Sequence, residues 1–189
     1  VFYTFGPIPL SRMPLGEVFS GVTMGLGIFA ITVYLNTYDK KLFFMELDLQ
    51  HFAITGSTTA ALAGVWASIP LIATIANIML ANNLCDLEQD IENHRYTLPF
   101  YLGKKNAVIL FNFLMYGSYL AIVIGLITGI YQWPILITFL SLLKVYPQTK
   151  AFTKEQIKHK TFAMSIKNLV AFNGSYALGL LVTLFWQLI

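Results

Sequence analysis

Ala60–Ala81 reads AALAGVWASIPLIATIANIMLA and runs directly into Asn82–Glu92, which reads NNLCDLEQDIE. The first stretch has no charged side chain, and the second has four carboxylates. An α-helix rises about 1.5 Å per residue, so a stretch of this length suits the roughly 30 Å hydrocarbon core of a bilayer. The two stretches together therefore predict a transmembrane helix with acidic groups at its end.

The composition of the whole chain extends this prediction. Hydrophobic residues make up 57% of the 189 residues and charged residues 11%, against roughly 25% charged in an ordinary soluble domain. We predict an all-α, polytopic transmembrane helix bundle that forms one domain over residues 1–189. The candidate spans are Val18–Leu35, Ala60–Ala81, Ala107–Ile130, Trp133–Tyr146 and Leu169–Ile189.

Two parts of this assignment leave alternatives open. Trp133–Tyr146 is short and is bounded by Pro134 and Pro147, so it is either a tilted span or a re-entrant segment. The loop 36–59 contains Phe43–Leu49, which reads FFMELDL and predicts either a short interfacial helix or a plain connector.

The basic residues predict the orientation of the chain. Ten of the 12 Lys and Arg residues lie in the loops 1–17, 82–106 and 144–167, and the other two lie in the loop 36–59. Because basic loops remain in the cytoplasm, we expect the acidic stretch on the cytoplasmic side of the cell (inner) membrane. The net charge of +3 then reflects a basic inner face, and no nucleic-acid partner is expected.

Oxygen ligands recur along the acidic stretch. On one continuous helix Asn82, Asp86 and Asp90 would share a face, with Asn83 beside them and His94 one turn further if the helix continued. Such oxygens suit a hard divalent cation such as Mg²⁺.

A basic and aromatic loop follows the acidic stretch. Arg95 and Lys104 in this loop could neutralise the phosphate oxygens of a ligand bound through that cation. The alternative is a solvated acidic loop followed by basic residues that only set topology, with His94 a surface residue.

These residues resemble a known family, the UbiA-type intramembrane prenyltransferases, and most closely its 1,4-dihydroxy-2-naphthoate branch, which makes demethylmenaquinone. Two motifs carry the resemblance. The second aspartate-rich motif of the family is similar to Asn82-Asn83-x-x-Asp86-x-x-x-Asp90, followed by Arg95-x-Thr97-Leu98 and Leu102-Gly103. An earlier cytoplasmic loop of the branch is similar to Gly6-Pro7-x-Pro9 and Pro14-Leu15-Gly16-Glu17.

The resemblance implies nine transmembrane helices around a cavity, with two aspartate-rich motifs at its cytoplasmic mouth. This chain resembles helices five to nine, so we expect a missing N-terminal half of the bundle to carry the first motif. Four positions depart from the branch: Cys85 replaces Arg, His94 replaces Gly, Arg95 replaces Lys and Arg12 replaces Tyr. Because Cys85 removes a positive charge, the diphosphate contact there would come from Arg12 or Lys104.

The implied reaction joins a polyprenyl diphosphate to 1,4-dihydroxy-2-naphthoate within the lipid bilayer. Mg²⁺ would assist departure of the diphosphate, and the naphthoate would attack the allylic carbocation and lose its carboxylate. The resemblance assigns Asp86 and Asp90 as catalytic metal ligands and Asn82 as a further ligand. It assigns Asn83 the role of orienting those ligands. It also assigns diphosphate binding to three basic residues, Arg95, Lys104 and Arg12.

Three other interpretations remain. A CDP-alcohol phosphotransferase would carry a longer Asp-Gly…Ala-Arg…Gly…Asp-x-x-x-Asp signature, which is absent. A non-catalytic quinone- or lipid-binding membrane subunit would need no chemistry at the acidic stretch. The chain by itself could also be an inactive fragment that lacks the first aspartate-rich motif.

Overall fold

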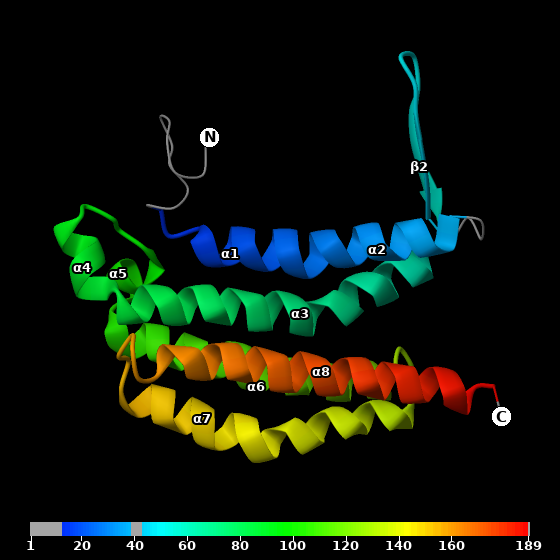
Figure 1. The fold of residues 1–189 in the computed structure, drawn as a ribbon. Coiled ribbons are helices and arrows are strands. Elements are labelled where there is room, and N and C mark those ends of the chain that lie inside the picture. The colour runs from blue at the N-terminus through cyan, green and yellow to red at the C-terminus, as the bar shows by residue number, and fades with distance from the viewer. Residues whose placement is uncertain (1–12, 39–42, 189) are drawn as a thin grey trace.

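The computed structural model describes residues 13–38 and 43–188. Long helical rods lie side by side along one direction, with the short helices α4 and α5 at one end and a β-hairpin at the other (Figure 1). The predicted all-α polytopic fold is confirmed. Arg12 and most of the early loop 6–17 lie outside the described residues.

Within the described residues, four helical stretches are long and apolar enough to cross a membrane, judged by length and composition: Gly16–Thr37, Thr58–Cys85, Lys104–Ile127 and Phe162–Trp186. The first consists of α1 (Gly16–Ser20), the π-helix η2 (Gly21–Gly27) and α2 (Ile28–Thr37). The other three are α3, α6 and α8.

The short predicted span, Trp133–Tyr146, lies in a further helical rod of the bundle. Trp133–Ser141 forms the 3₁₀-helix η4, and Leu142–Lys154 continues as α7. At about 2.0 Å per residue in a 3₁₀-helix and 1.5 Å in an α-helix, the two elements reach roughly 37 Å. This rod runs along the bundle and does not double back, as a re-entrant segment would (Figure 1).

The loop after α2 differs from the prediction. Phe43–Leu47 (β1) and Phe52–Gly56 (β2) pair as an antiparallel hairpin, so the predicted interfacial helix is wrong. Asp48 explains the turn, because its Oδ1 accepts hydrogen bonds from the backbone N–H of Gln50 at 2.7 Å and of His51 at 2.6 Å. These two bonds also lower the pKa of Asp48.

Two clusters of buried side chains hold the rods together. The first lies between α6, η4, α7 and α8 and includes Tyr119, whose hydroxyl is 2.6 Å from Ser141 Oγ. The second lies at the acidic end and consists of Leu80, Ala81, Leu84, Ala107, Phe111 and Phe152. This second cluster fixes the last turns of α3 against α6 and α7, and so positions the polar residues that follow.

Candidate functional site

The long helix α3 ends at Cys85, and the short helix α4 covers Leu87–Glu92. Asp86 links them with φ −100° and ψ 5°, so the acidic stretch is not one continuous helix. The backbone still advances one turn at a time, since Asp86 N–H donates to Asn82 O at 3.1 Å and Asp90 N–H donates to Asp86 O at 2.8 Å. Asn82, Asp86 and Asp90 therefore remain one turn apart, but they are on two helices.

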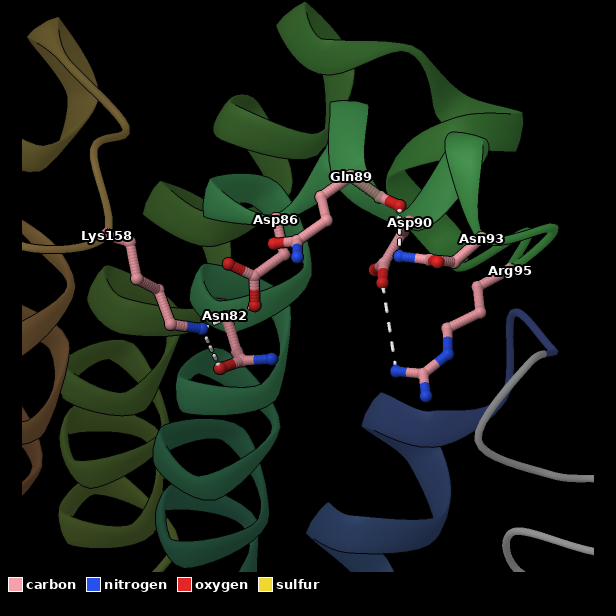
Figure 2. Close-up of polar contacts among 7 residues, drawn as sticks. All are labelled: Asn82, Asp86, Gln89, Asp90, Asn93, Arg95 and Lys158. Atoms are coloured by element: carbon pink, nitrogen blue, oxygen red, sulfur yellow. Dashed lines mark hydrogen bonds and ion pairs between the residues drawn. The ribbon is translucent and has the colours of Figure 1, made fainter.

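The connection between α7 and α8 supplies a cation that the sequence did not single out. The ammonium of Lys158 donates to Asn82 Oδ1 at 2.5 Å and also to Asp86 Oδ2 (Figure 2). The side chains of Lys158 and Asp86 are 43% and 24% exposed. Two oxygens from successive turns of the acidic stretch thus converge on one positive charge.

Asp90 has a different counter-charge. Its Oδ1 lies 4.0 Å from Nη1 of Arg95, and the backbone N–H of Arg95 donates to Asp90 O at 2.8 Å. Burial is the main reason that the pKa of Asp90 is raised, while the Arg95 charge opposes that shift and the nearby Asp86 carboxylate adds to it. The two predicted carboxylate ligands are therefore each paired with a separate base.

A cavity of about 370 Å³ lies between these two pairs, lined by Asp86, Gln89, Asp90, Asn93 and Arg95. Figure 2 shows Asn82 and Asp86 directed toward Lys158, with Asp90 and Arg95 across from them. Carboxylate, amide and guanidinium groups around one open hollow can bind a cation together with an anion.

Asn83 turns away from this cavity. Its Nδ2 donates to Glu17 Oε1 at 2.8 Å, and the Glu17 side chain is only 3% exposed. Among the described residues, Glu17 Oε2 is buried without a hydrogen-bond partner. Asn83 thus ties the acidic end of α3 to α1.

The remaining predicted residues lie around the same end of the bundle. Lys104 is the exposed first residue of α6 (Lys104–Ile127), and no ion pair in the described part of the chain joins it to Asp86 or Asp90. It follows Gly103, at φ 74°, and α5 (Leu98–Leu102). His94 is exposed and lies beyond the end of α4 at φ 53°, so the helix does not continue to His94 and the ligand stripe does not include it.

The donor set fits a hard cation only in part. Within residues 13–38 and 43–188, no three His, Cys, Asp or Glu side chains gather closely enough to hold a metal ion. However, Asn82 Oδ1 and Asp86 Oδ2 already converge on a cationic group, the Lys158 ammonium. These oxygens are the types that Mg²⁺ and Mn²⁺ prefer, with phosphate oxygens and waters as further ligands.

A second, larger cavity is mostly apolar. It has a volume of about 570 Å³ and lies between η2, α3 and α8, and its lining residues are Ser20, Met24, Ile75, Ile78, Met79, Asn82, Phe162, Leu169 and Asn173. Asn82 therefore belongs both to the cation-binding pair and to the wall of this apolar cavity.

Lys158 was missed because it is 72 residues from Asp86 in the chain. The one sequence signal was its position in the basic loop 144–167, which the distribution of basic residues places on the side of the acidic stretch. That signal does not separate Lys158 from its basic neighbours.

Comparisons with known proteins match both a family and a single relative. A family model described as the UbiA prenyltransferase family matches residues 1–171. The chain is 29% identical over 187 residues to the 1,4-dihydroxy-2-naphthoate octaprenyltransferase of Bacillus subtilis (strain 168). The match covers 97% of this chain and 53% of that protein, so the chain spans about half the length of the relative. No solved structure matches the chain.

Proposed function

The chain belongs to the UbiA prenyltransferase family, and on that premise we propose that it acts in transfer of a polyprenyl group from an isoprenoid diphosphate to 1,4-dihydroxy-2-naphthoate. Support for the acceptor comes from the Bacillus subtilis relative, which is described as a 1,4-dihydroxy-2-naphthoate octaprenyltransferase. The product would be demethylmenaquinone.

The position of Asn82 carries the proposal. Its Oδ1 shares a cationic partner with Asp86 Oδ2, and its side chain also lines the apolar cavity between η2, α3 and α8. An isoprenoid diphosphate matches this combination of a cationic and an apolar neighbour, because its anionic head needs cations and its apolar tail needs burial. The head would lie at the polar cavity and the tail among the apolar side chains.

Asn82, Asp86 and Asp90 would hold a divalent cation, for which we propose Mg²⁺. Such a cation would neutralise the negative charge that develops on the diphosphate as it leaves. Arg95 would add positive charge at the diphosphate, with Lys104 and Arg12 as further candidates, and Asn83 would keep the end of α3 in position through Glu17. The apolar cavity would exclude water, which would otherwise capture the allylic carbocation.

A second acidic motif is part of the proposal. Asp86 and Asp90 are two carboxylates, and the described residues bring no third acid beside them that would complete a metal site. We propose that the missing N-terminal half of the family bundle supplies the first aspartate-rich motif. We further propose that both motifs face the cytoplasm across the cell membrane.

One assay tests these assignments. The assay contains the chain in detergent, 1,4-dihydroxy-2-naphthoate, a polyprenyl diphosphate and Mg²⁺. It is run with and without an upstream half-bundle that carries the first aspartate-rich motif. We expect prenylated product from the combined protein, loss on addition of EDTA, and a fall of roughly 100-fold or more in Asp86→Asn and Asp90→Asn. Glu88→Gln is the matched control, because it removes an exposed charge from the same helix and should retain activity.

The apolar cavity also favours a second candidate, a non-catalytic quinone- or lipid-binding subunit. That candidate predicts binding of a quinone by the chain and no product under any of these conditions. Product that persists at full rate in both aspartate variants would contradict the assigned metal ligands.

A further inference from the structure

The Lys158 ammonium lies between the side-chain oxygens of Asn82 and Asp86. Its Nζ donates to Asn82 Oδ1 and to Asp86 Oδ2 (Figure 2). The same Nζ lies 4.7 Å from the centre of the Phe162 ring. An ammonium is a compact point charge with three donors, so it competes for the same oxygen lone pairs as a small hard cation.

The backbone around Lys158 is held by hydrogen bonds, while its side chain is partly exposed. Thr161 closes the connection between α7 and α8, since its Oγ1 accepts from Ile157 N–H at 2.9 Å and donates to Ile157 O at 3.1 Å. Thr161 itself is buried, whereas the Lys158 side chain is 43% exposed. Release of the ammonium into water therefore requires rotation of one long side chain and no change in the fold.

A divalent cation and the Lys158 ammonium compete for these oxygens. A Mg²⁺ ion lies about 2.0–2.1 Å from its ligand oxygens and would meet the ammonium at close range, where the two positive charges repel. We infer that the Lys158 ammonium binds the Asn82–Asp86 pair when no metal is present. A divalent cation then binds this pair only when the ammonium leaves.

This inference rests on the proposed function, because it takes Asn82 and Asp86 as metal ligands. It adds a role for Lys158 that the family resemblance did not assign. Lys158 is a positioning residue. Without metal, its ammonium neutralises Asp86 and keeps the side chains of Asn82 and Asp86 in place. After the exchange, its positive charge is free at the same end of the bundle as Arg95. Binding of metal and release of Lys158 are then one equilibrium.

Direct metal binding tests the exchange without turnover. Mn²⁺ is the probe, because it accepts the same oxygen ligands as Mg²⁺ and its free form is measured by electron paramagnetic resonance. We expect Lys158→Met to bind Mn²⁺ roughly two- to fivefold more tightly than the unmodified chain, as expected from loss of a partly exposed ion pair. Lys158→Arg retains the charge and should bind more weakly than Lys158→Met.

Lys160→Met is the matched control. Lys160 is an exposed lysine in the same connection, so its replacement removes the same charge without touching Asn82 or Asp86. Equal Mn²⁺ affinities in Lys158→Met and Lys160→Met, or weaker binding in Lys158→Met, would overturn the exchange.

A labelling experiment tests the same equilibrium without any variant. A brief pulse of an acylating reagent modifies free lysine amines, and mass spectrometry reads each site. We expect Mn²⁺ to increase the labelling rate of Lys158 severalfold and to leave that of Lys160 unchanged. An unchanged rate at Lys158, under conditions where Mn²⁺ is bound, contradicts the inference even if Lys158→Met fails to fold.

Asp86→Asn separates this inference from the proposed function. If Mn²⁺ binds the chain and Asp86→Asn abolishes that binding, the metal assignment stands, and the two Lys158 measurements decide the exchange alone. If Mn²⁺ binding is absent, or the same in Asp86→Asn, both the metal assignment and the exchange fail.

Discussion

Asn82 and Asn83 are adjacent amides, yet they have different partners. Asn82 accepts from Lys158, whereas Asn83 donates to the buried carboxylate of Glu17. Successive residues of a helix point about 100° apart, so the two amides face different neighbours. One can therefore bind a ligand while the other supports the fold.

Asn83→Leu should destabilise the protein. The Asn83 amide is the one side-chain donor to Glu17 in the described part of the chain, and the leucine would leave both carboxyl oxygens without a side-chain partner. An unsatisfied buried acceptor costs about 1–3 kcal/mol, measurable as a lower unfolding temperature in detergent. Glu17→Gln retains an acceptor oxygen and should change the unfolding temperature little. Equal unfolding temperatures for Asn83→Leu and the unmodified chain would contradict this role.

His94 has a backbone conformation that favours glycine. Its φ is 53°, and the 1,4-dihydroxy-2-naphthoate branch that this chain resembles has Gly at that position. A β-branched residue should strain this turn by roughly 1–2 kcal/mol, so His94→Val should open the adjacent Asp90–Arg95 turn. Hydrogen exchange of the Arg95 amide, which donates to Asp90 O, should then accelerate about tenfold. His94→Gly is the control, and exchange that is equally fast in both variants would contradict this strain.

At the scale of elements, the contact between η2 and α3 depends on Gly25. A Cβ built at Gly25 would lie 2.6 Å from both N and Cα of Ile72, a contact that the backbone cannot relieve without moving. Small residues allow transmembrane helices to approach in this way. The close approach also forms one wall of the apolar cavity, since Ser20 and Met24 line it from the first rod and Ile75 from α3.

Gly25→Ala should therefore separate the first rod from α3. Overpacking of this kind costs about 1–3 kcal/mol, seen as a lower unfolding temperature. Gly174→Ala is the matched control, because a Cβ added at Gly174 would have nothing within 4 Å and alanine favours a helix. If both variants unfold at the same temperature, the contact with Ile72 does not limit packing.

For the whole molecule, orientation across the membrane is testable. The hairpin lies at one end of the bundle and α4 at the other (Figure 1). In a Cys85→Ser background, single cysteines at Glu88 and Lys160 should react with an impermeant maleimide from the cytoplasmic side, and one at Leu49 from the opposite side. All three positions are exposed. Labelling of all three from one side would contradict the proposed topology.

Much of the fold follows from local sequence, and some does not. The apolar run Ala60–Ala81 lies within α3, as its composition and length predict. The secondary structure of Phe43–Leu47 does not follow from its local sequence, because a short, mostly apolar run suits a helix or a strand equally. The Asp48 turn and the pairing with Phe52–Gly56 decide in favour of a strand. The bend at Asp86 was also missed, since the spacing of Asn82, Asp86 and Asp90 is the same for one helix or two.

The sequence by itself determined the class of the molecule, a polytopic helical membrane protein, and the acidic stretch with its resemblance to the UbiA prenyltransferases. Both depend on composition and spacing over short distances, which the chain carries locally. Only the tertiary structure decided which lysine meets Asp86, namely Lys158, 72 residues away in the chain. Long-range pairs depend on how the rods pack and on where each connection ends, so neighbouring lysines in one loop become distinguishable only after the bundle has formed.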